Sequence, residues 1–170
     1  MQLAEFNGLD AATATEVVGV WAAIPEWRDA VVAGRPYGSV DELAAVAATT
    51  AGSWTRDDLD AALSRHPRIG ERAGGSGAEA AASRREQASM SDAGADIGRA
   101  IVEGNAEYER RFGRVFLIRA AGRSPDELLA ELTRRLRNDA DAEAVEAVGQ
   151  LREIALLRLR STVTDEGTPA

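Results

Sequence analysis

The stretch DAEAVEAVGQLREIALLRLRS, residues 141–161, decides the fold class. At about 100° per residue, its apolar side chains fall on one face, which is the pattern of an amphipathic helix. That face holds Ala144, Ala147, Val148, Leu151, Ile154 and Ala155. Glu153 and Arg160 fall on the opposite face, where water can solvate their charges. The stretch therefore predicts a long terminal helix that packs against the rest of the chain with one side.

Helix start signals extend this pattern toward the N-terminus. Ser124-Pro125-Asp126-Glu127 is a capping box with proline at the first helical position, and its helix is expected to end near Asn138. Ser39-Val40-Asp41-Glu42 is a second capping box, for a helix that runs to about Thr50. The remaining expected helices cover residues 10–23, 25–34, 55–66, 78–90 and 92–111, the last interrupted by Gly98 and Gly104.

One apolar run, Val115 to Ile118, has no clear period. It is short and partly β-branched, so it could form a strand-like insert or a buried helical turn. The chain as a whole is predicted to be all-α, a single-domain bundle of about seven to eight helices with little or no strand over residues 1–162. A polar C-terminal tail, residues 163–170, is expected to fray.

The composition excludes several classes of chemistry. The 170 residues include no cysteine and one histidine, so thiolate nucleophiles and histidine-cluster metal sites are excluded. All 20 basic residues are arginine, which removes Schiff-base chemistry on lysine. The net charge of -8 argues against a nucleic-acid partner. The sequence holds neither a signal peptide nor an apolar run long enough for a membrane span, so a cytoplasmic protein is expected.

Arg158 breaks the apolar pattern of the terminal helix. It falls near the middle of the face that Leu151, Ile154 and Ala155 share. A guanidinium in the core needs an anionic partner, because an unpaired buried charge is very costly. Arg158 is therefore either an anion-binding group or an ordinary structural residue, which pairs with a carboxylate or reaches solvent along its own stem.

Two further features could carry chemistry. Ser83, Glu86 and Gln87 stand at i, i+3 and i+4, so on a helix they share one face and could read the polar edges of a small ring. The alternative is an exposed polar face with chance spacing. His66, the one imidazole, follows an amphipathic helix and could move protons near neutral pH. The alternative for His66 is a surface or capping histidine.

Together these residues resemble the OHCU decarboxylase family, the 2-oxo-4-hydroxy-4-carboxy-5-ureidoimidazoline decarboxylases of urate degradation. The similarity extends from Phe6 to about Leu159. No single motif is specific to this family, but the order and spacing of the motifs together are. The motifs are His66-Pro67-Arg68-Ile69-Gly70, Ser83 with Glu86-Gln87, Tyr108-Glu109-Arg110-Arg111-Phe112-Gly113 before Phe116-Leu117-Ile118, Gly122-Arg123-Ser124, and Glu153-Ile154 before Arg158-Leu159.

The resemblance implies a role for each matching position. His66 and Glu86 would be the catalytic pair, and Arg158 the group that binds the anionic substrate. The implied substrate contacts are Pro67, Ser83, Gln87 and the segment Phe116, Leu117, Ile118, Arg119 and Ala120. These side chains are expected to converge on one enclosed cavity.

The resemblance also implies how the protein would work in the cell. It would be a cytoplasmic homodimer that needs no cofactor and no metal, acts on a small anionic molecule and follows urate oxidase and hydroxyisourate hydrolase in a pathway. The alternative is a non-catalytic helical ligand-binding or adaptor protein on the same fold, for which His66 would be dispensable.

Overall fold

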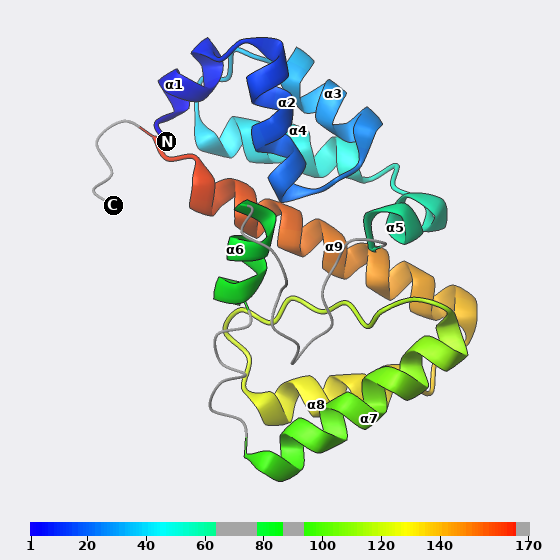
Figure 1. Ribbon diagram of the computed structural model, residues 1–170. Coiled ribbons are helices and arrows are strands. Elements are labelled where there is room, and N and C mark those ends of the chain that lie inside the picture. The colour runs from blue at the N-terminus through cyan, green and yellow to red at the C-terminus, as the bar shows by residue number, and fades with distance from the viewer. Residues whose placement is uncertain (64–77, 87–93, 166–170) are drawn as a thin grey trace. The chain divides into compact units, whose positions relative to one another are not determined.

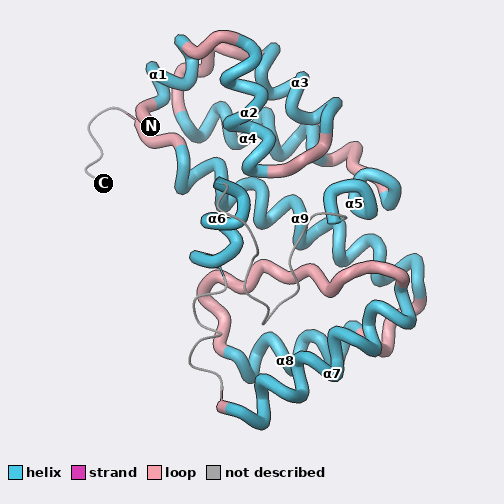
Figure 2. The backbone as a smooth tube through the Cα atoms, viewed as in Figure 1, coloured by secondary structure: helices cyan, strands magenta, loops and turns pink. Residues whose placement is uncertain are grey.

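The computed structural model describes residues 1–63, 78–86 and 94–165, and these residues form nine α-helices (Figures 1 and 2). The helices are α1 (Leu3–Gly8), α2 (Ala11–Trp21), α3 (Pro25–Ala33), α4 (Val40–Ala51), α5 (Arg56–Leu63), α6 (Ala78–Glu86), α7 (Ala95–Phe112), α8 (Pro125–Arg135) and α9 (Ala140–Thr162). Within the described residues the β-structure is one isolated parallel bridge, between Gln2 and Thr164. The all-α prediction is confirmed.

The helix start signals lie where the sequence predicted them. The Ser124 hydroxyl accepts a hydrogen bond from the Glu127 N–H at 3.3 Å, and the Glu127 carboxylate accepts one from the Ser124 N–H at 2.7 Å. The Ser39 hydroxyl likewise accepts a hydrogen bond from the Glu42 N–H at 3.1 Å, but the Glu42 carboxylate accepts one from the Gly38 N–H at 2.6 Å, so Ser39 is an N-cap without the reciprocal contact of a capping box. These contacts satisfy backbone donors that have no partner within the first helical turn.

Two helix predictions need correction. The short helix α1 was not predicted, because six residues are too few to show a helical period. The helix over α7 was expected to be interrupted at Gly98 and Gly104, but it is continuous. A Cβ built on Gly104 would lie 2.6 Å from Cδ2 of Leu132, so this glycine allows α7 to approach α8 closely. Its place in the sequence reflects helix packing and not a helix break.

The chain forms two compact units, each described here by itself. The first unit comprises residues 1–61 and 152–170, and the second comprises residues 62–151. Two pairs of aromatic rings mark the core of the first unit. The rings of Phe6 and Trp21 lie 5.6 Å apart, and those of Trp27 and Trp54 lie 5.4 Å apart. The indole N–H of Trp27 also donates to the Ala47 carbonyl of α4 at 2.9 Å, which joins α3 to α4.

The two ends of the described chain meet in the first unit. The Leu3 N–H donates to the Thr164 carbonyl at 2.9 Å, and the carboxylate of Asp165 accepts a hydrogen bond from the Val40 N–H at the start of α4. Val163 is buried. The expectation that the chain frays after residue 162 is therefore wrong for Val163 to Asp165. Residues 166–170 lie outside the described residues, so the tail prediction stays untested there.

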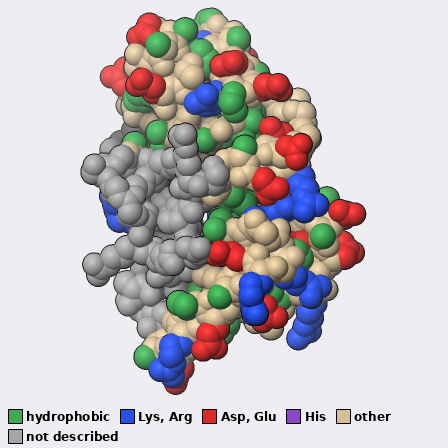
Figure 3. All heavy atoms as spheres, turned by 45° about the vertical axis from the view of Figure 1, so that its right-hand side comes forward, with side chains coloured by type: hydrophobic (Ala, Val, Ile, Leu, Met, Phe, Trp, Pro, Cys, Tyr) green, Lys and Arg blue, Asp and Glu red, His purple; other side chains and the backbone are tan. Residues whose placement is uncertain are grey.

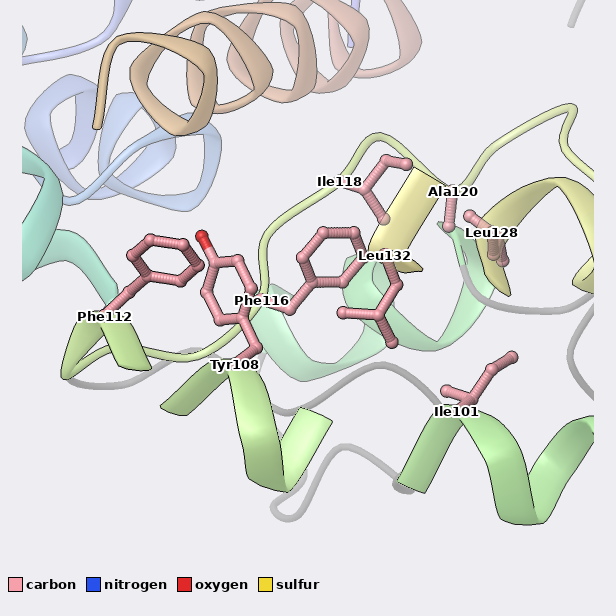
Figure 4. Close-up of a cluster of buried hydrophobic side chains, with 8 residues drawn as sticks. All are labelled: Ile101, Tyr108, Phe112, Phe116, Ile118, Ala120, Leu128 and Leu132. Carbon is pink, nitrogen blue, oxygen red and sulfur yellow. The ribbon is translucent and has the colours of Figure 1, made fainter. Parts of the chain in front are cut away.

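A hydrophobic cluster forms the core of the second unit (Figure 4). Its side chains come from α7, from α8 and from the chain segment between these two helices. The buried members are Ile101, Tyr108, Phe112, Phe116, Ile118, Ala120, Leu128 and Leu132. The ring of Tyr108 lies 4.7 Å from that of Phe112 and 5.1 Å from that of Phe116.

Charged side chains of both signs are interspersed on the face drawn in Figure 3. Several form exposed ion pairs, such as Arg160 with Asp41 at 2.7 Å and Arg134 with Glu131 at 3.0 Å. Among the described residues, no helix combines the length and the apolar character that crossing a membrane requires.

Candidate active site

The predicted site residues differ in how far the structure describes them. His66, Pro67 and Gln87 lie outside the described residues, so their predicted roles stay untested. Ser83 and Glu86 both lie in α6, so the helical backbone on which the shared-face argument depends is present. The helix was expected to continue to Met90, and residues 87–90 again lie outside the described part. The predicted convergence on one cavity therefore remains a prediction.

Arg158 is buried on α9, as the helical pattern predicted. Its side chain is only 3% exposed, so the reading in which it reaches solvent along its own stem is excluded. Nη1 of Arg158 donates to the Val20 carbonyl at 3.1 Å. Val20 lies in the last turn of α2, where carbonyls lack partners within the helix and the helix dipole favours a cation. The end of α2 thus holds one edge of the guanidinium.

The other expected charges of α9 also agree with the pattern. Glu153 and Arg160 are exposed, while all six predicted apolar positions between residues 144 and 155 are buried. The predicted orientation of α9 is therefore correct, and Arg158 is buried although its side chain is charged. A buried guanidinium is suited to bind a carboxylate or another small anion through two parallel hydrogen bonds.

The sequence left the run Val115 to Ile118 open between a strand-like insert and a buried helical turn, and in the structure this run is part of the irregular segment 115–120. It forms no ladder with another strand and no helical turn, yet Phe116, Leu117, Ile118 and Ala120 are each at most 5% exposed. Its apolar side chains enter the cluster of the second unit, which explains the missing period (Figure 4). Irregular buried backbone needs hydrogen-bond partners from outside the segment.

Two side chains supply such partners on either side of Ile118. Nη1 of Arg135, on α8, donates to the Leu117 carbonyl at 2.6 Å. Oε1 of Gln150, on α9, accepts a hydrogen bond from the Arg119 N–H at 2.9 Å. Within the described residues, the N–H and C=O of Ile118 itself form no hydrogen bond. The segment therefore holds one peptide donor and one peptide acceptor that have no hydrogen-bond partner among the described residues.

Arg135 belongs to a buried polar network that the sequence analysis did not predict. Its guanidinium forms an ion pair with Glu143, and the two side chains are 1% and 0% exposed. The phenol O–H of Tyr108 donates to the same carboxylate, and Asn138 Nδ2 donates to its second oxygen at 2.8 Å. The guanidinium also lies 4.8 Å from the centre of the Phe116 ring. Such a network is favourable only when every member is satisfied.

The network also fixes the protonation of Tyr108. Burial raises the pKa of its phenol well above the usual value, and the hydrogen bond to Glu143 raises it further. Tyr108 therefore remains a hydrogen-bond donor at all physiological pH values. As a donor, Tyr108 contributes its hydrogen bond to the Glu143 carboxylate.

The spacing that located Arg158 could also have located Arg135. Leu128, Leu132 and Arg135 stand at i, i+4 and i+7 of α8, and all three are buried. An arginine on the apolar stripe of a helix is the same anomaly in both cases. The apolar spacing of α8 thus marks Arg135 in the sequence in the same way as the spacing of α9 marks Arg158.

Comparison with known proteins decides the family. The family model described as OHCU decarboxylase matches residues 7–160, which is most of the chain. The chain belongs to the OHCU decarboxylase family. Family membership confirms the resemblance that the motifs from His66 to Leu159 indicated.

Curated relatives extend over nearly the whole chain. A protein of Amia calva named 2-oxo-4-hydroxy-4-carboxy-5-ureidoimidazoline decarboxylase is 30% identical over 166 residues, covering 96% of this chain and 95% of its own. A protein of the same name from Haloferax volcanii is 27% identical and covers 98% of both chains. The mouse protein of that name is 27% identical over 162 residues, covering 94% of this chain and 91% of its own.

Solved structures share the fold. A crystal structure of an OHCU decarboxylase in the presence of (S)-allantoin has a TM-score of 0.71 at 24% identity, covering 84% of this chain and 94% of its own. A crystal structure of (S)-allantoin synthase has a TM-score of 0.69 at 16% identity. It covers 96% of this chain, which corresponds to 54% of that longer protein. The all-α architecture is therefore that of the OHCU decarboxylase fold.

Proposed function

We propose that this protein decarboxylates 2-oxo-4-hydroxy-4-carboxy-5-ureidoimidazoline and releases (S)-allantoin during urate breakdown. The observation that carries the proposal is the family match over residues 7–160. It is supported by relatives that bear this enzyme name and align over almost their full length. The buried guanidinium of Arg158 is a second support, because the substrate is an anion.

The substrate itself explains why such a reaction needs no bound electron sink. One ring carbon carries both the hydroxyl and the carboxylate. When its bond to the carboxylate breaks, CO2 leaves and the electron pair forms a C=C bond to the neighbouring ring carbon. The π pair of that carbon's C=N bond moves to the nitrogen, which takes up a proton. The resulting enol loses its hydroxyl proton while the neighbouring carbon gains one, which gives the ring carbonyl of allantoin. The task of the protein is then to orient the carboxylate and move protons.

The proposed roles follow from the chemistry of each side chain. Arg158 holds the anionic substrate through a bidentate contact, which a planar guanidinium supplies. His66 and Glu86 act as a coupled pair that moves the proton. The remaining proposed contacts fix the ureido group and the ring amides, and they are Pro67, Ser83, Gln87 and Phe116 to Ala120.

Delivery of the proton from one side would make the product a single enantiomer. A proton donor held in one position protonates the planar enol on one face only, whereas water protonates both faces equally. This is the reason for proposing (S)-allantoin and not the racemate. The proposal also includes a homodimer in the cytoplasm, supplied with substrate by urate oxidase and hydroxyisourate hydrolase.

The direct test follows the ultraviolet absorbance of freshly generated substrate and captures the released CO2. The wild-type protein should accelerate both signals together. His66→Ala should lower kcat by about 100- to 10,000-fold, the usual contribution of a general acid–base group, while circular dichroism shows an unchanged helical content. Ligand binding without CO2 release by the wild-type protein would contradict the proposal and favour a non-catalytic binding protein. Near-normal turnover by His66→Ala would exclude this residue from the chemistry.

A further inference from the structure

The buried network of the second unit reaches beyond its own ion pair. Nε and Nη2 of Arg135, which form one edge of its guanidinium, donate to Oε1 of Glu143, while Nη1 donates to the Leu117 carbonyl. Because a guanidinium is planar and rigid, fixing that edge on Glu143 also fixes the direction in which Nη1 points. The ion pair thus orients a donor toward an irregular stretch of chain.

A second hydrogen bond holds the same segment at Arg119, two residues beyond Leu117. Gln150 is partly buried on α9, and its Oε1 accepts the hydrogen bond from the Arg119 N–H. Arg135 and Gln150 come from different helices, and they form hydrogen bonds with the peptide groups on either side of Ile118. Irregular chain loses its conformation easily unless such contacts hold it. The peptide groups of Ile118, which are without hydrogen bonds in the described residues, are therefore held at a fixed position and angle.

We propose that Arg135 and Gln150 are positioning residues that aim the N–H and C=O of Ile118 at the amide edge of the substrate. The inference rests on the proposed function, since it assigns a substrate contact to that site. Neither side chain needs to touch the substrate. Glu143, Tyr108 and Asn138 support Arg135, so the whole network serves the geometry of this one segment.

Substitutions at Gln150 and Arg135 separate a loss of substrate positioning from a loss of folding. Gln150→Leu removes the acceptor for the Arg119 N–H, whereas Gln150→Glu keeps an acceptor oxygen at the same place. Arg135→Lys keeps a cation beside Glu143, so no buried charge is left unpaired, but one ammonium cannot span both Glu143 and Leu117. The matched control is Arg134→Lys, the same change one residue earlier, at an exposed ion pair with Glu131 and Glu146.

The test measures kcat and KM for decarboxylation together with amide hydrogen exchange over residues 115–120. Gln150→Leu and Arg135→Lys should each lower kcat/KM by roughly tenfold, the cost of a misdirected hydrogen bond, and should speed exchange in the segment. Gln150→Glu should recover most of both readouts, and Arg134→Lys should change neither. All pH profiles of kcat should keep the wild-type shape, because no proton-transfer group is altered.

The possible failures are distinguishable. Wild-type kcat/KM in Gln150→Leu and Arg135→Lys would overturn the positioning role, even if exchange became faster. Failure of Gln150→Glu to recover kcat/KM would overturn it as well, since it would tie the loss to something other than the acceptor. A wild-type protein without decarboxylase activity would instead refute the proposed function. Unchanged hydrogen exchange in Gln150→Leu and Arg135→Lys would show that these two side chains do not hold the segment in place, whatever the activity of the variants.

Discussion

At the scale of single residues, three arginines are buried among the described residues, Arg114, Arg135 and Arg158, and the last two differ in their contacts. Arg135 is paired with the Glu143 carboxylate inside the second unit. Arg158 is held through a backbone carbonyl at the end of α2, and a helix end carries only a partial negative charge. Anion binding is proposed for Arg158 and not for Arg135 because Arg158 stands at the position that the family motif Glu153-Ile154 before Arg158-Leu159 marks.

Arg158→Lys tests that assignment. An ammonium can still donate to the Val20 carbonyl and interact with the end of α2, so the fold should persist. It cannot form the planar bidentate contact, so we expect kcat/KM to fall by about 100-fold, as is usual when a substrate is misplaced by about 1 Å.

The matched control for Arg158 lies two residues along the same helix. Arg160→Lys changes an exposed ion pair with Asp41 and should leave kcat/KM unaltered. Steady-state kinetics of Arg158→Lys and Arg160→Lys test whether Arg158 binds the anionic substrate. Equal activity of Arg158→Lys and wild type would remove the anion-binding role.

At the scale of elements, the contact between α7 and α8 depends on one glycine. A Cβ at Gly104 would lie 2.6 Å from Cδ2 of the buried Leu132, whereas a Cβ at Gly98 would meet nothing within 4 Å. Both glycines lie inside the same continuous helix, so replacing either by alanine gains similar helix propensity, about 1 kcal/mol.

The difference in unfolding free energy between Gly104→Ala and Gly98→Ala therefore measures the cost of crowding Leu132. We expect Gly104→Ala to have a free energy of unfolding about 1–3 kcal/mol below that of Gly98→Ala, the usual cost of overpacking a core. Denaturant titration of both variants measures this difference. Equal stabilities would show that α7 and α8 are not in the close contact described.

A second element-scale prediction concerns acid. The hydrogen bond from Arg134 lowers the pKa of Glu146 on α9, burial opposes that shift, and the hydrogen bond from Asn138 adds to it. A carboxyl with a lowered folded-state pKa stabilises the fold above its unfolded pKa of about 4.3, and this stabilisation is lost as pH falls through the folded value. Because Glu146 is partly exposed, the contribution should stay below about 1 kcal/mol.

Glu146→Gln should accordingly destabilise the protein at pH 7 and have little effect at pH 3. Unfolding by denaturant at the two pH values gives the comparison, with Glu103→Gln at an exposed position of α7 as the control for loss of a charge. A destabilisation by Glu146→Gln that is the same at both pH values would contradict the assigned titration.

The elements also show which parts of the fold a single sequence reveals. The capping box at Ser124, the N-cap at Ser39 and the apolar face of α9 are local patterns, and the structure confirms them. The segment over residues 115–120 could not be predicted, because its backbone is held by side chains from α8 and α9. Gly104 looked like a helix break because its reason, Leu132, lies on another helix.

At the scale of the whole molecule, long-range contacts that leave no periodic trace account for the remaining differences from the sequence predictions. Burial of Val163 and the pairing of Leu3 with Thr164 join the two ends of the described chain. No local pattern announces such a contact, so the last residues looked like a frayed tail. The family, in contrast, was recognisable from the order and spacing of the motifs in this sequence, and the family match over residues 7–160 confirms it.

The central claim is that this chain turns an achiral enol into one enantiomer of allantoin. The most direct measurement adds the protein to urate with urate oxidase and hydroxyisourate hydrolase, and follows the chirality of allantoin by circular dichroism. We predict an early signal of (S)-allantoin with the wild-type protein and none with His66→Ala. Racemic allantoin, formed at the same rate with and without the protein, would contradict the account.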